Sequence, residues 1–377
     1  MGAPIRIGIL YSTVGAYGAF GRECRDGAEL AAERLAREGV PVELVIADPE
    51  GEASRYVTLA RELLRDKGCR HIVGTALSAA RKDVTPLIEK HDALLWYICP
   101  YEGFEANENI IYTGACPNQH LLPLFEHLIP RHGRRVFLLG ANYVWGWEMN
   151  RLARELLLSS GGEVVGERFL PIEETDIRRL IAEIRAQRPS FILNNLIGPS
   201  SYAFLAAMHE LARQDPAFRP EVCPVVSCDL TECELGEIEG GAATGQLATA
   251  CYFDSLDTPE NRAFKALAMT RYGTDRRFSS FFSGAYAAVR LCAESIHAAG
   301  ADEPSAVRRA VCGPVHQTVQ GPLRIDPQTN HATLPFHLGR INDHGGFDVI
   351  ASRPPIVADP YLTGLRAARA AHLRVVS

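Results

Sequence analysis

The chain has 377 residues, more than twice the roughly 150 of a typical domain, and 47 % of them are hydrophobic and 22 % charged. This composition is globular and excludes a disordered, collagenous or small disulfide-stapled protein. The net charge is −6, without a block of like charges, so we expect no direct contact with nucleic acid. No apolar run reaches the roughly 18 residues that a transmembrane helix needs.

The start of the chain and its cysteines indicate the cytoplasm. The first apolar run, residues 5–11, is too short for a secretory signal peptide. Ten cysteines occur without a C-x-x-C pair, and so many free thiols suit a reducing compartment. We therefore expect a cytoplasmic protein. The alternative is the periplasm, if a leader was removed from this sequence.

Signatures of catalysis, cofactors and metals are missing from the sequence. It contains no H-E-x-x-H, no G-x-x-x-x-G-K-[ST] and no G-x-S-x-G. The histidines lack the spacing of metal ligands. The glycine-rich loop at 15–21 has the spacing G-x-x-G-x-x-G, which indicates a flexible entry to a helix rather than a dinucleotide site. We expect a protein that is not an enzyme and has no cofactor and no metal.

Short β-rich runs alternate with helical patterns from the start of the chain, which is typical of parallel sheets covered by helices. This alternation predicts an α/β fold of two doubly wound lobes. In the first lobe, strands are predicted at 5–12, 42–47, 70–75, 94–98 and 110–113, and helices at 25–38, 54–67 and 79–91.

The alternation begins again after residue 118 and predicts a second lobe. Its strands are predicted at 136–140, 163–170, 191–197 and 223–227, and its helices at 119–132, 148–159, 176–187 and 200–214. The rest of the chain contains a strand at 246–253, helices at 259–272, 283–299 and 305–312, and a β-hairpin region at 323–325 and 337–341 that ends at 347–350. Periodicity alone does not say to which lobe these last elements belong.

Polar and aromatic residues follow several predicted strands at their carboxyl ends, where doubly wound sheets bind ligands. Ser78 stands at the start of a predicted helix, where it either binds a ligand oxygen or only caps the helix. Tyr97 and Tyr101 follow a strand of the first lobe, and Tyr143 and Trp145 follow a strand of the second. Singly each could be a packing residue. Together they predict an apolar site with a few polar groups for a small molecule.

Three segments carry a family resemblance. Residues 100–105 spell Pro-Tyr-Glu-Gly-Phe-Glu, 117–119 spell Pro-Asn-Gln, and 252–259 spell Tyr-Phe-Asp-Ser-Leu-Asp-Thr-Pro. With these segments the chain resembles the type I periplasmic-binding-protein fold and, within it, the amide and urea binders. It is most similar there to the amide-sensing negative regulators of aliphatic amidase operons. The resemblance covers nearly the whole chain.

The resemblance implies two lobes, joined by three crossings, that close on a ligand between them. It divides the chain into a first lobe of residues 4–118 plus 252–328, a second of 119–251 plus 329–361, and a C-terminal tail of 362–377. It also implies that residues from both lobes contact the ligand. These are Ser78, Tyr97, Cys99 and Pro100 from the first lobe, and Tyr143, Trp145, Thr231 and Glu232 from the second.

By the same resemblance we expect a sensor that binds a short aliphatic amide or a urea-like molecule. Such a sensor controls amidase expression through a partner, an RNA-binding antiterminator protein, and a homodimer is left open. The alternative is the solute-binding receptor of an ABC transporter for urea, short amides or branched-chain amino acids. A third hypothesis, an enzyme with a Cys99 thiolate as nucleophile, lacks a histidine close to Cys99 in the motif.

Three positions depart from the pattern of the regulators. Ala76 and Trp145 each stand where the regulators have tyrosine, and Cys99 stands where they have threonine. Ala76 enlarges one wall of the expected site and Trp145 fills another. These positions therefore bear on which ligand is bound.

Overall fold

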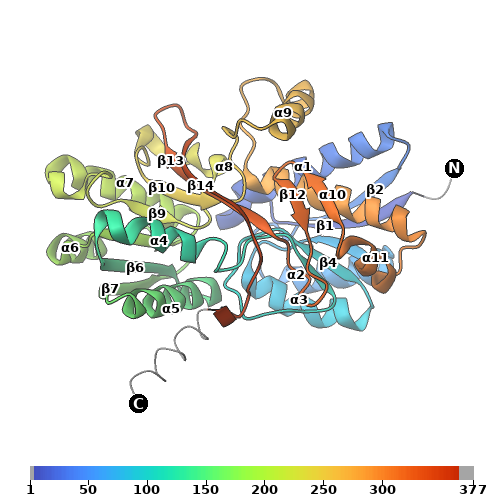
Figure 1. The fold of residues 1–377 in the computed structure, drawn as a ribbon, viewed down its shortest axis with the longest axis horizontal. Helices are drawn as coiled ribbons and strands as arrows, with labels where there is room; N and C mark the ends of the chain where they lie inside the picture. Colours follow the sequence, from blue (N-terminus) through green and yellow to red (C-terminus); the bar gives the residue numbers. More distant parts are fainter. Residues whose placement is uncertain (1–3, 365–377) are drawn as a thin grey trace, which may run out of the picture.

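The computed structural model describes residues 4–364. Figure 1 shows two lobes side by side, each built on a sheet with helices on its faces. The sheet of the first lobe is wholly parallel, in the order β2-β1-β3-β4-β5. Its strands are β1 (Ile5–Leu10), β2 (Val42–Ala47), β3 (His71–Gly74), β4 (Leu94–Tyr97) and β5 (Ile110–Tyr112).

The sheet of the second lobe has the order β14-β13-β10-β9-β8-β6-β7. The strands from β10 to β7 are parallel, and β13 and β14 add an antiparallel edge. Its strands are β6 (Arg135–Ala141), β7 (Glu163–Leu170), β8 (Phe191–Asn195), β9 (Val225–Ser227), β10 (Leu247–Ala250), β13 (Leu334–Ile341) and β14 (Phe347–Ile356). The predicted α/β architecture of two doubly wound lobes is confirmed.

Helices cover both sheets. The first lobe carries α1 (Gly18–Arg37), α2 (Arg55–Arg61) with the π turn η2 (Glu62–Asp66), α3 (Ser78–Lys90), α9 (Pro259–Tyr272), α10 (Ser280–Ala299) and α11 (Pro304–Val311). The second carries α4 (Leu121–His132), α5 (Val144–Ser159), α6 (Arg178–Gln187), α7 (Pro199–Gln214) and the short α8 (Glu232–Leu235). The described residues also contain the 3-10 turns η1 (Gly15–Tyr17), η3 (Pro216–Phe218) and η4 (Glu239–Gly241).

The sequence sets the ends of α9 and α10 through local hydrogen bonds. Thr258 caps α9 by accepting from the N–H of Asn261, and Pro259 occupies the first turn, where no N–H is needed. Ser279 caps α10 by accepting from the N–H of Phe282. A glycine in the left-handed conformation, Gly300, ends α10. These residues explain where both helices begin and where α10 ends.

Helix α1 begins at Gly18, seven residues before the predicted start at Arg25, because its glycines serve close packing rather than flexibility. A Cβ on Gly27 would lie 2.2 Å from the carbonyl oxygen of Phe282 on α10. A Cβ on Gly21 would lie 1.8 Å from the carbonyl oxygen of Ser12. Only glycine allows α1 to lie so close to α10 and to the end of β1.

The order of strands reverses once in each sheet. In the first lobe β1 lies between β2 and β3, and in the second β6 lies between β7 and β8. The loops that follow β1 and β3, and those that follow β6 and β8, therefore diverge at these points and leave a crevice at the carboxyl ends of the strands. Both crevices face the junction of the two lobes, and they position the candidate site.

The chain passes between the two sheets three times, after β5, after β10 and before β13. The second passage brings α10 back against α1 of the first lobe (Figure 1). The lobe boundaries given above stay predictions. Residues 365–377 of the predicted tail lie outside the described part of the chain.

The predicted β-hairpin region is wrong in its pairing. The strand β12 (Gly321–Arg324) pairs with β11 (Val315–Thr318) in a separate two-stranded sheet, whereas β13 pairs with β10 and β14 of the second lobe. The third passage between the lobes separates β12 from β13. The strand β14 also runs on to Ile356, past the predicted end at residue 350, because an edge strand tolerates the two prolines near its end.

The lobes are packed in a closed arrangement. The buried apolar core of the first lobe continues without interruption to Trp145 and Met149 on α5 of the second lobe. A second core cluster lies wholly within the second lobe, around Phe137 and Phe204. Within residues 4–364, no helix is both long and apolar enough to span a bilayer.

Candidate functional site

A small cavity lies between the lobes where the two strand-order reversals meet. Its volume is about 30 Å³, room for roughly two water molecules. We call it the front cavity. It is lined by Tyr17, Phe20, Ala76, Ser78, Cys99, Pro100, Tyr143, Trp145, Ile197, Asp229 and Phe281. Five of the eight predicted contact residues thus lie around one space: Ser78, Cys99, Pro100, Tyr143 and Trp145.

Ser78 does not cap its helix, so the capping alternative is wrong. The N-cap of α3 is Leu77, and no side chain satisfies the first N–H groups of the helix. The Ser78 hydroxyl instead donates to the carboxylate of Glu102 at 2.7 Å. The free N–H groups at the start of α3 are therefore available to an oxygen atom in the front cavity.

A buried ion network supports this wall of the cavity. Arg81 is fully buried and binds Glu102 at 2.8 Å and Glu105 at 3.1 Å. Burial alone would raise the pKa of Glu105, but Arg81 and other donors hold it at about 2. Tyr97 is fully buried too and lies behind the cavity rather than in it, with the Arg81 guanidinium 4.6 Å from its ring centroid. Tyr97 therefore supports the network instead of lining the space.

The second lobe supplies Tyr143 and Trp145 from the start of α5. The hydroxyl of Tyr143 is hydrogen-bonded to that of Tyr17, which joins the lobes across the cavity. The indole Nε1–H of Trp145 is buried and has no hydrogen-bond partner. A buried donor without a partner costs about 1–3 kcal/mol, and a ligand oxygen in the cavity would remove that cost.

The other two predicted contacts from the second lobe, Thr231 and Glu232, lie apart from the front cavity. Thr231 caps α8 in a capping box with Glu234. Glu232 points elsewhere, since its Oε1 accepts from the N–H of Asp254 at 2.8 Å, and burial raises its pKa to about 8. Neither residue lines the front cavity.

Asp229 is the charged residue that sequence reasoning left out of the predicted contacts. It follows β9 and lines the front cavity, where its carboxylate accepts from the Ser227 hydroxyl at 2.6 Å. Burial raises the pKa of Asp229 to about 6. Phe20 and Phe281 were missed as well, because both lie in the first turns of helices that were predicted to begin later.

A second cavity of about 30 Å³ adjoins the first. We call it the hinge cavity, because segments from all three passages between the lobes line it. It shares Pro100, Asp229 and Phe281 with the front cavity and is otherwise lined by Ile98, Ala115, Gln119, His120, Cys228, Thr231, Thr249, Ala250, Cys251, Ser280, Pro335 and Phe336.

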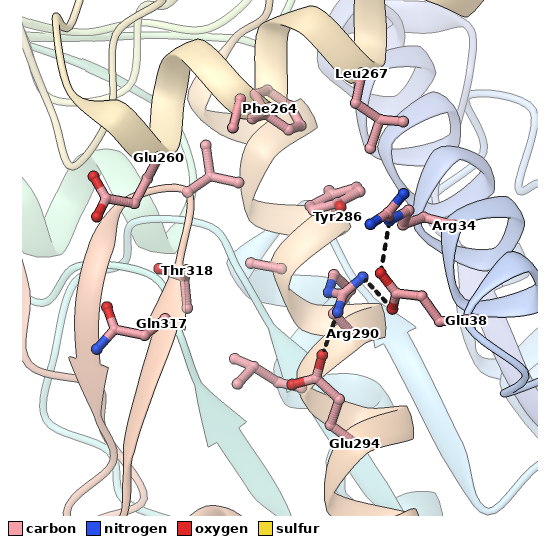
Figure 2. Close-up of a pocket in the computed structure, with 14 residues that line it drawn as sticks. Arg34, Glu38, Glu260, Phe264, Leu267, Tyr286, Arg290, Glu294, Gln317 and Thr318 are labelled. Atoms are coloured by element: carbon pink, nitrogen blue, oxygen red, sulfur yellow. Dashed lines mark hydrogen bonds and ion pairs between the residues drawn. The ribbon is translucent and has the colours of Figure 1, made fainter.

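A much larger cavity, of about 390 Å³, lies on the outer side of the first lobe between α1, α9, α10 and β11. We call it the outer cavity. Figure 2 shows that Arg34, Glu38, Arg290 and Glu294 bind one another in this cavity. Arg290 on α10 joins Glu38 of α1 at 3.0 Å and Glu294 at 2.7 Å, and Arg34 binds Glu38 at 2.6 Å.

Cys99, the nucleophile of the enzyme hypothesis, lines the front cavity. Burial raises the pKa of the Cys99 thiol to about 12, so no thiolate is present at neutral pH and the enzyme hypothesis for Cys99 is not supported. Among residues 4–364, no group of three or more His, Cys, Asp or Glu side chains is placed to hold a metal ion.

Comparisons with known proteins agree with this fold. The chain is 23 % identical over 308 residues to "Leu/Ile/Val-binding protein homolog 6" of Brucella abortus, a match that covers 80 % of this chain and 77 % of the relative. A solute binding protein of an ABC transporter from Rhodopseudomonas palustris HaA2, solved in complex with p-hydroxybenzoic acid, has a TM-score of 0.85 at 22 % identity over 95 % of this chain and 99 % of that chain.

An amino acid ABC transporter substrate-binding protein from Pseudomonas fluorescens Pf-5 has a TM-score of 0.80 at 20 % identity. That match covers 96 % of this chain and 99 % of the other. At such identities the solved structures show a shared fold. They do not single out the amide-sensing regulators, so that finer resemblance stays a prediction.

The predicted cytoplasmic location is wrong. The matching family consists of periplasmic binding proteins and the solved neighbours are transporter receptors, which point to the periplasm. All ten cysteines lie in the described part of the chain and are free, and most are buried. A family model described as "Periplasmic binding protein domain" matches residues 5–367, and the chain belongs to this family of ligand-binding proteins.

Proposed function

We propose that the protein is the solute receptor of an ABC transporter and that it closes its two lobes on a small neutral molecule, a short amide or a urea-like compound. The observation that carries this proposal is the unpartnered Nε1–H of Trp145 in a cavity that the Asp229 carboxyl and Ser78, the first residue of the uncapped α3, also line. A carbonyl oxygen can accept from α3 and Trp145, while an amide N–H donates to Asp229.

The transporter role rests on the relatives, which are named as transporter receptors or as a homologue of a Leu/Ile/Val-binding protein. The amide-sensing regulator with an antiterminator partner is the second candidate. The segment 100–105 supports the amide- and urea-binding branch to which these regulators belong, because the resemblance to that branch is specific there. A permease gene beside this one would support the transporter role, and genes for an amidase and an antiterminator would support the regulator.

The size of the front cavity favours a ligand of few atoms. At about 30 Å³ it has room for roughly two water-sized groups, and the adjoining hinge cavity doubles that space. The two cavities together hold about four water-sized groups, close to the four or five heavy atoms of the short amides and of urea, and less than half of the about nine or ten heavy atoms of leucine or of the aromatic acid bound by the Rhodopseudomonas neighbour. A ligand of four heavy atoms is limited to about 6 kcal/mol, so we expect a dissociation constant of tens of micromolar or weaker.

Charge also argues for a neutral ligand. No lysine or arginine lines the front cavity, and Arg81 behind it is already bound to Glu102 and Glu105. An aromatic carboxylate would meet Asp229 without a counter-ion. An amino acid is the competing ligand, because its carboxylate suits the start of α3 and its ammonium group suits Asp229.

Isothermal titration calorimetry with acetamide, propionamide, butyramide, urea and leucine tests this proposal. We expect a short amide or urea to bind while leucine gives no heat. If leucine binds tightly and the amides give no heat, the ligand is an amino acid and the proposal of a neutral ligand is wrong. If none of the five compounds gives heat, the proposed class of ligand, short amides and urea-like compounds, is refuted.

A further inference from the structure

The hinge cavity is lined by two buried polar side chains whose hydrogen-bonding capacity is only partly used. His120 is 3 % exposed and precedes α4 at the first passage between the lobes. Thr249 is 2 % exposed and lies on β10 at the second passage. The Nδ1 of His120 is buried and has no hydrogen-bond partner, and the buried Oγ1 of Thr249 has no partner stronger than the weak thiol of Cys228. Native interiors contain few such atoms, and each one calls for an explanation.

The chemistry of His120 is fixed by its other nitrogen. Its Nε2 lies 3.2 Å from the carbonyl oxygen of Tyr101, which can only accept, so Nε2 carries the proton. Burial lowers the pKa of His120 to about 4, and the ring is therefore neutral at pH 7. Nδ1 is then a bare acceptor. The Thr249 hydroxyl in the same cavity can both accept and donate.

The hinge cavity adjoins the proposed ligand site. Both cavities share Pro100, Asp229 and Phe281, so Asp229 lies on the wall between them. The ring of His120 lies 6.3 Å, centroid to centroid, from the ring of Trp145, which lines the front cavity. A ligand bound at Trp145 and Asp229 therefore lies next to residues that line the hinge cavity.

We propose that the hinge cavity is a second subsite, which receives a hydroxyl or amino group at the far end of the ligand and binds it through Nδ1 of His120 and Oγ1 of Thr249. This inference rests on the proposed function, since the amide end occupies the front cavity. It narrows the ligand to a short amide with a hydrogen-bond donor at its other end. The room in the hinge cavity, about two water-sized groups, suits such an end.

Glycolamide and propionamide form a matched pair of probes. They have the same number of heavy atoms and the same amide group, and they differ only in a terminal hydroxyl against a terminal methyl. We expect the wild-type protein to bind glycolamide about fivefold more tightly, the effect of one net hydrogen bond. Calorimetric titration of both amides measures this ratio.

Substitutions test whether His120 and Thr249 cause the difference in affinity between glycolamide and propionamide. Thr249→Val keeps the shape of the side chain and removes its hydroxyl, and His120→Phe removes the acceptor. We expect either change to reduce the preference for glycolamide while propionamide binds as before. His120→Asn returns an acceptor near the position of Nδ1 and restores part of the preference. His127→Asn, on the partly exposed face of α4, is the control and leaves the ratio unchanged.

The outcomes separate the two proposals. If the wild-type protein binds both amides equally, or if the preference survives in both Thr249→Val and His120→Phe, the subsite is refuted while the amide site stands. If the wild-type protein binds neither amide, the proposed function fails and the subsite fails with it. Should His120→Phe fold poorly, the isosteric Thr249→Val still decides the matter.

Discussion

The outer cavity and the two cavities between the lobes differ in a way that identifies the candidate site. The outer cavity has about 390 Å³, yet the charges of Arg34, Glu38 and Arg290 are satisfied by one another. The front and hinge cavities have about 30 Å³ each and hold the unpartnered atoms of Trp145 and His120. The outer cavity is therefore larger, but buried polar atoms without hydrogen-bond partners occur at the two smaller cavities. These atoms, rather than volume, identify the candidate ligand site.

The largest expected effect comes from blocking closure of the lobes. Gly198 precedes α7 with φ +57°, and a Cβ there would lie 2.5 Å from the carbonyl oxygen of Ala16 in the opposite lobe. We expect Gly198→Ala to keep the lobes apart and to weaken ligand binding roughly tenfold to a hundredfold. Calorimetry with the best ligand of the panel measures the loss.

Gly240→Ala is the matched control for this change. Gly240 also has a positive φ, of +61°, but a Cβ there would meet nothing within 4 Å. We expect this variant to bind like the wild-type protein. Equal affinity in Gly198→Ala and the wild type would show that the ligand does not need the closed interface.

An intermediate effect is expected from pH. Burial raises the pKa of Asp229 to about 6, so the carboxyl is neutral below that pH and ionised above it. A ligand N–H binds the ionised form more strongly, so affinity falls as the solution is acidified through about pH 6. The loss of one charge-assisted bond makes binding about fivefold to tenfold weaker at about pH 5 than at about pH 7.

Two features make this pH dependence specific. The pKa of His120 is lowered to about 4 by burial, and burial raises that of Glu234 to about 8, so neither group titrates near pH 6. Asp229→Asn should give an affinity that no longer changes between pH 5 and pH 7. A flat profile in the wild-type protein would remove Asp229 from the site.

A smaller effect is expected at Trp145. Trp145→Phe keeps an aromatic ring against the cavity and removes the unpartnered Nε1–H. The ligand oxygen then has one hydrogen-bond donor fewer, so we expect affinity for the ligand to fall about threefold to tenfold. Tyr286→Phe in the outer cavity is the control, with unchanged affinity. A wild-type affinity in Trp145→Phe would mean that the ligand does not use the indole.

The smallest effect is expected at Arg290, which ties α10 to α1 in the outer cavity. Arg290→Met breaks the ion pairs with Glu38 and Glu294, which are partly exposed, so the free energy of unfolding should fall by up to about 1 kcal/mol. Ligand affinity should not change. Denaturant unfolding measures the free energy of unfolding, and calorimetry measures the ligand affinity. Weaker ligand binding in Arg290→Met would show that the outer cavity contributes to ligand recognition.

Much of the fold follows from local sequence patterns. The strands β2 and β7 and the helix α9 have the predicted bounds, because periodicity and caps define them locally. The starts of α1 and α10 were placed too late. Gly21 allows α1 to lie against the carbonyl oxygen of Ser12. This contact joins two segments of the chain, so no local sequence pattern predicts it.

The candidate site was predictable where it lies at strand ends, and less so elsewhere. Ser78, Tyr143 and Trp145 follow strands, and the structure places them around one cavity. Glu232 was placed there by resemblance, but its carboxylate turns to the backbone of Asp254, a contact that depends on the second passage between lobes. His120 carried no signal, because its environment comes from three distant segments.

A crystal structure of the protein with propionamide tests the central claim most directly. We expect the amide in the front cavity, with its oxygen near Nε1 of Trp145 and the start of α3 and its nitrogen near Asp229. Density for the amide in the outer cavity beside Tyr286 and Arg290, with the front cavity unchanged, would contradict it.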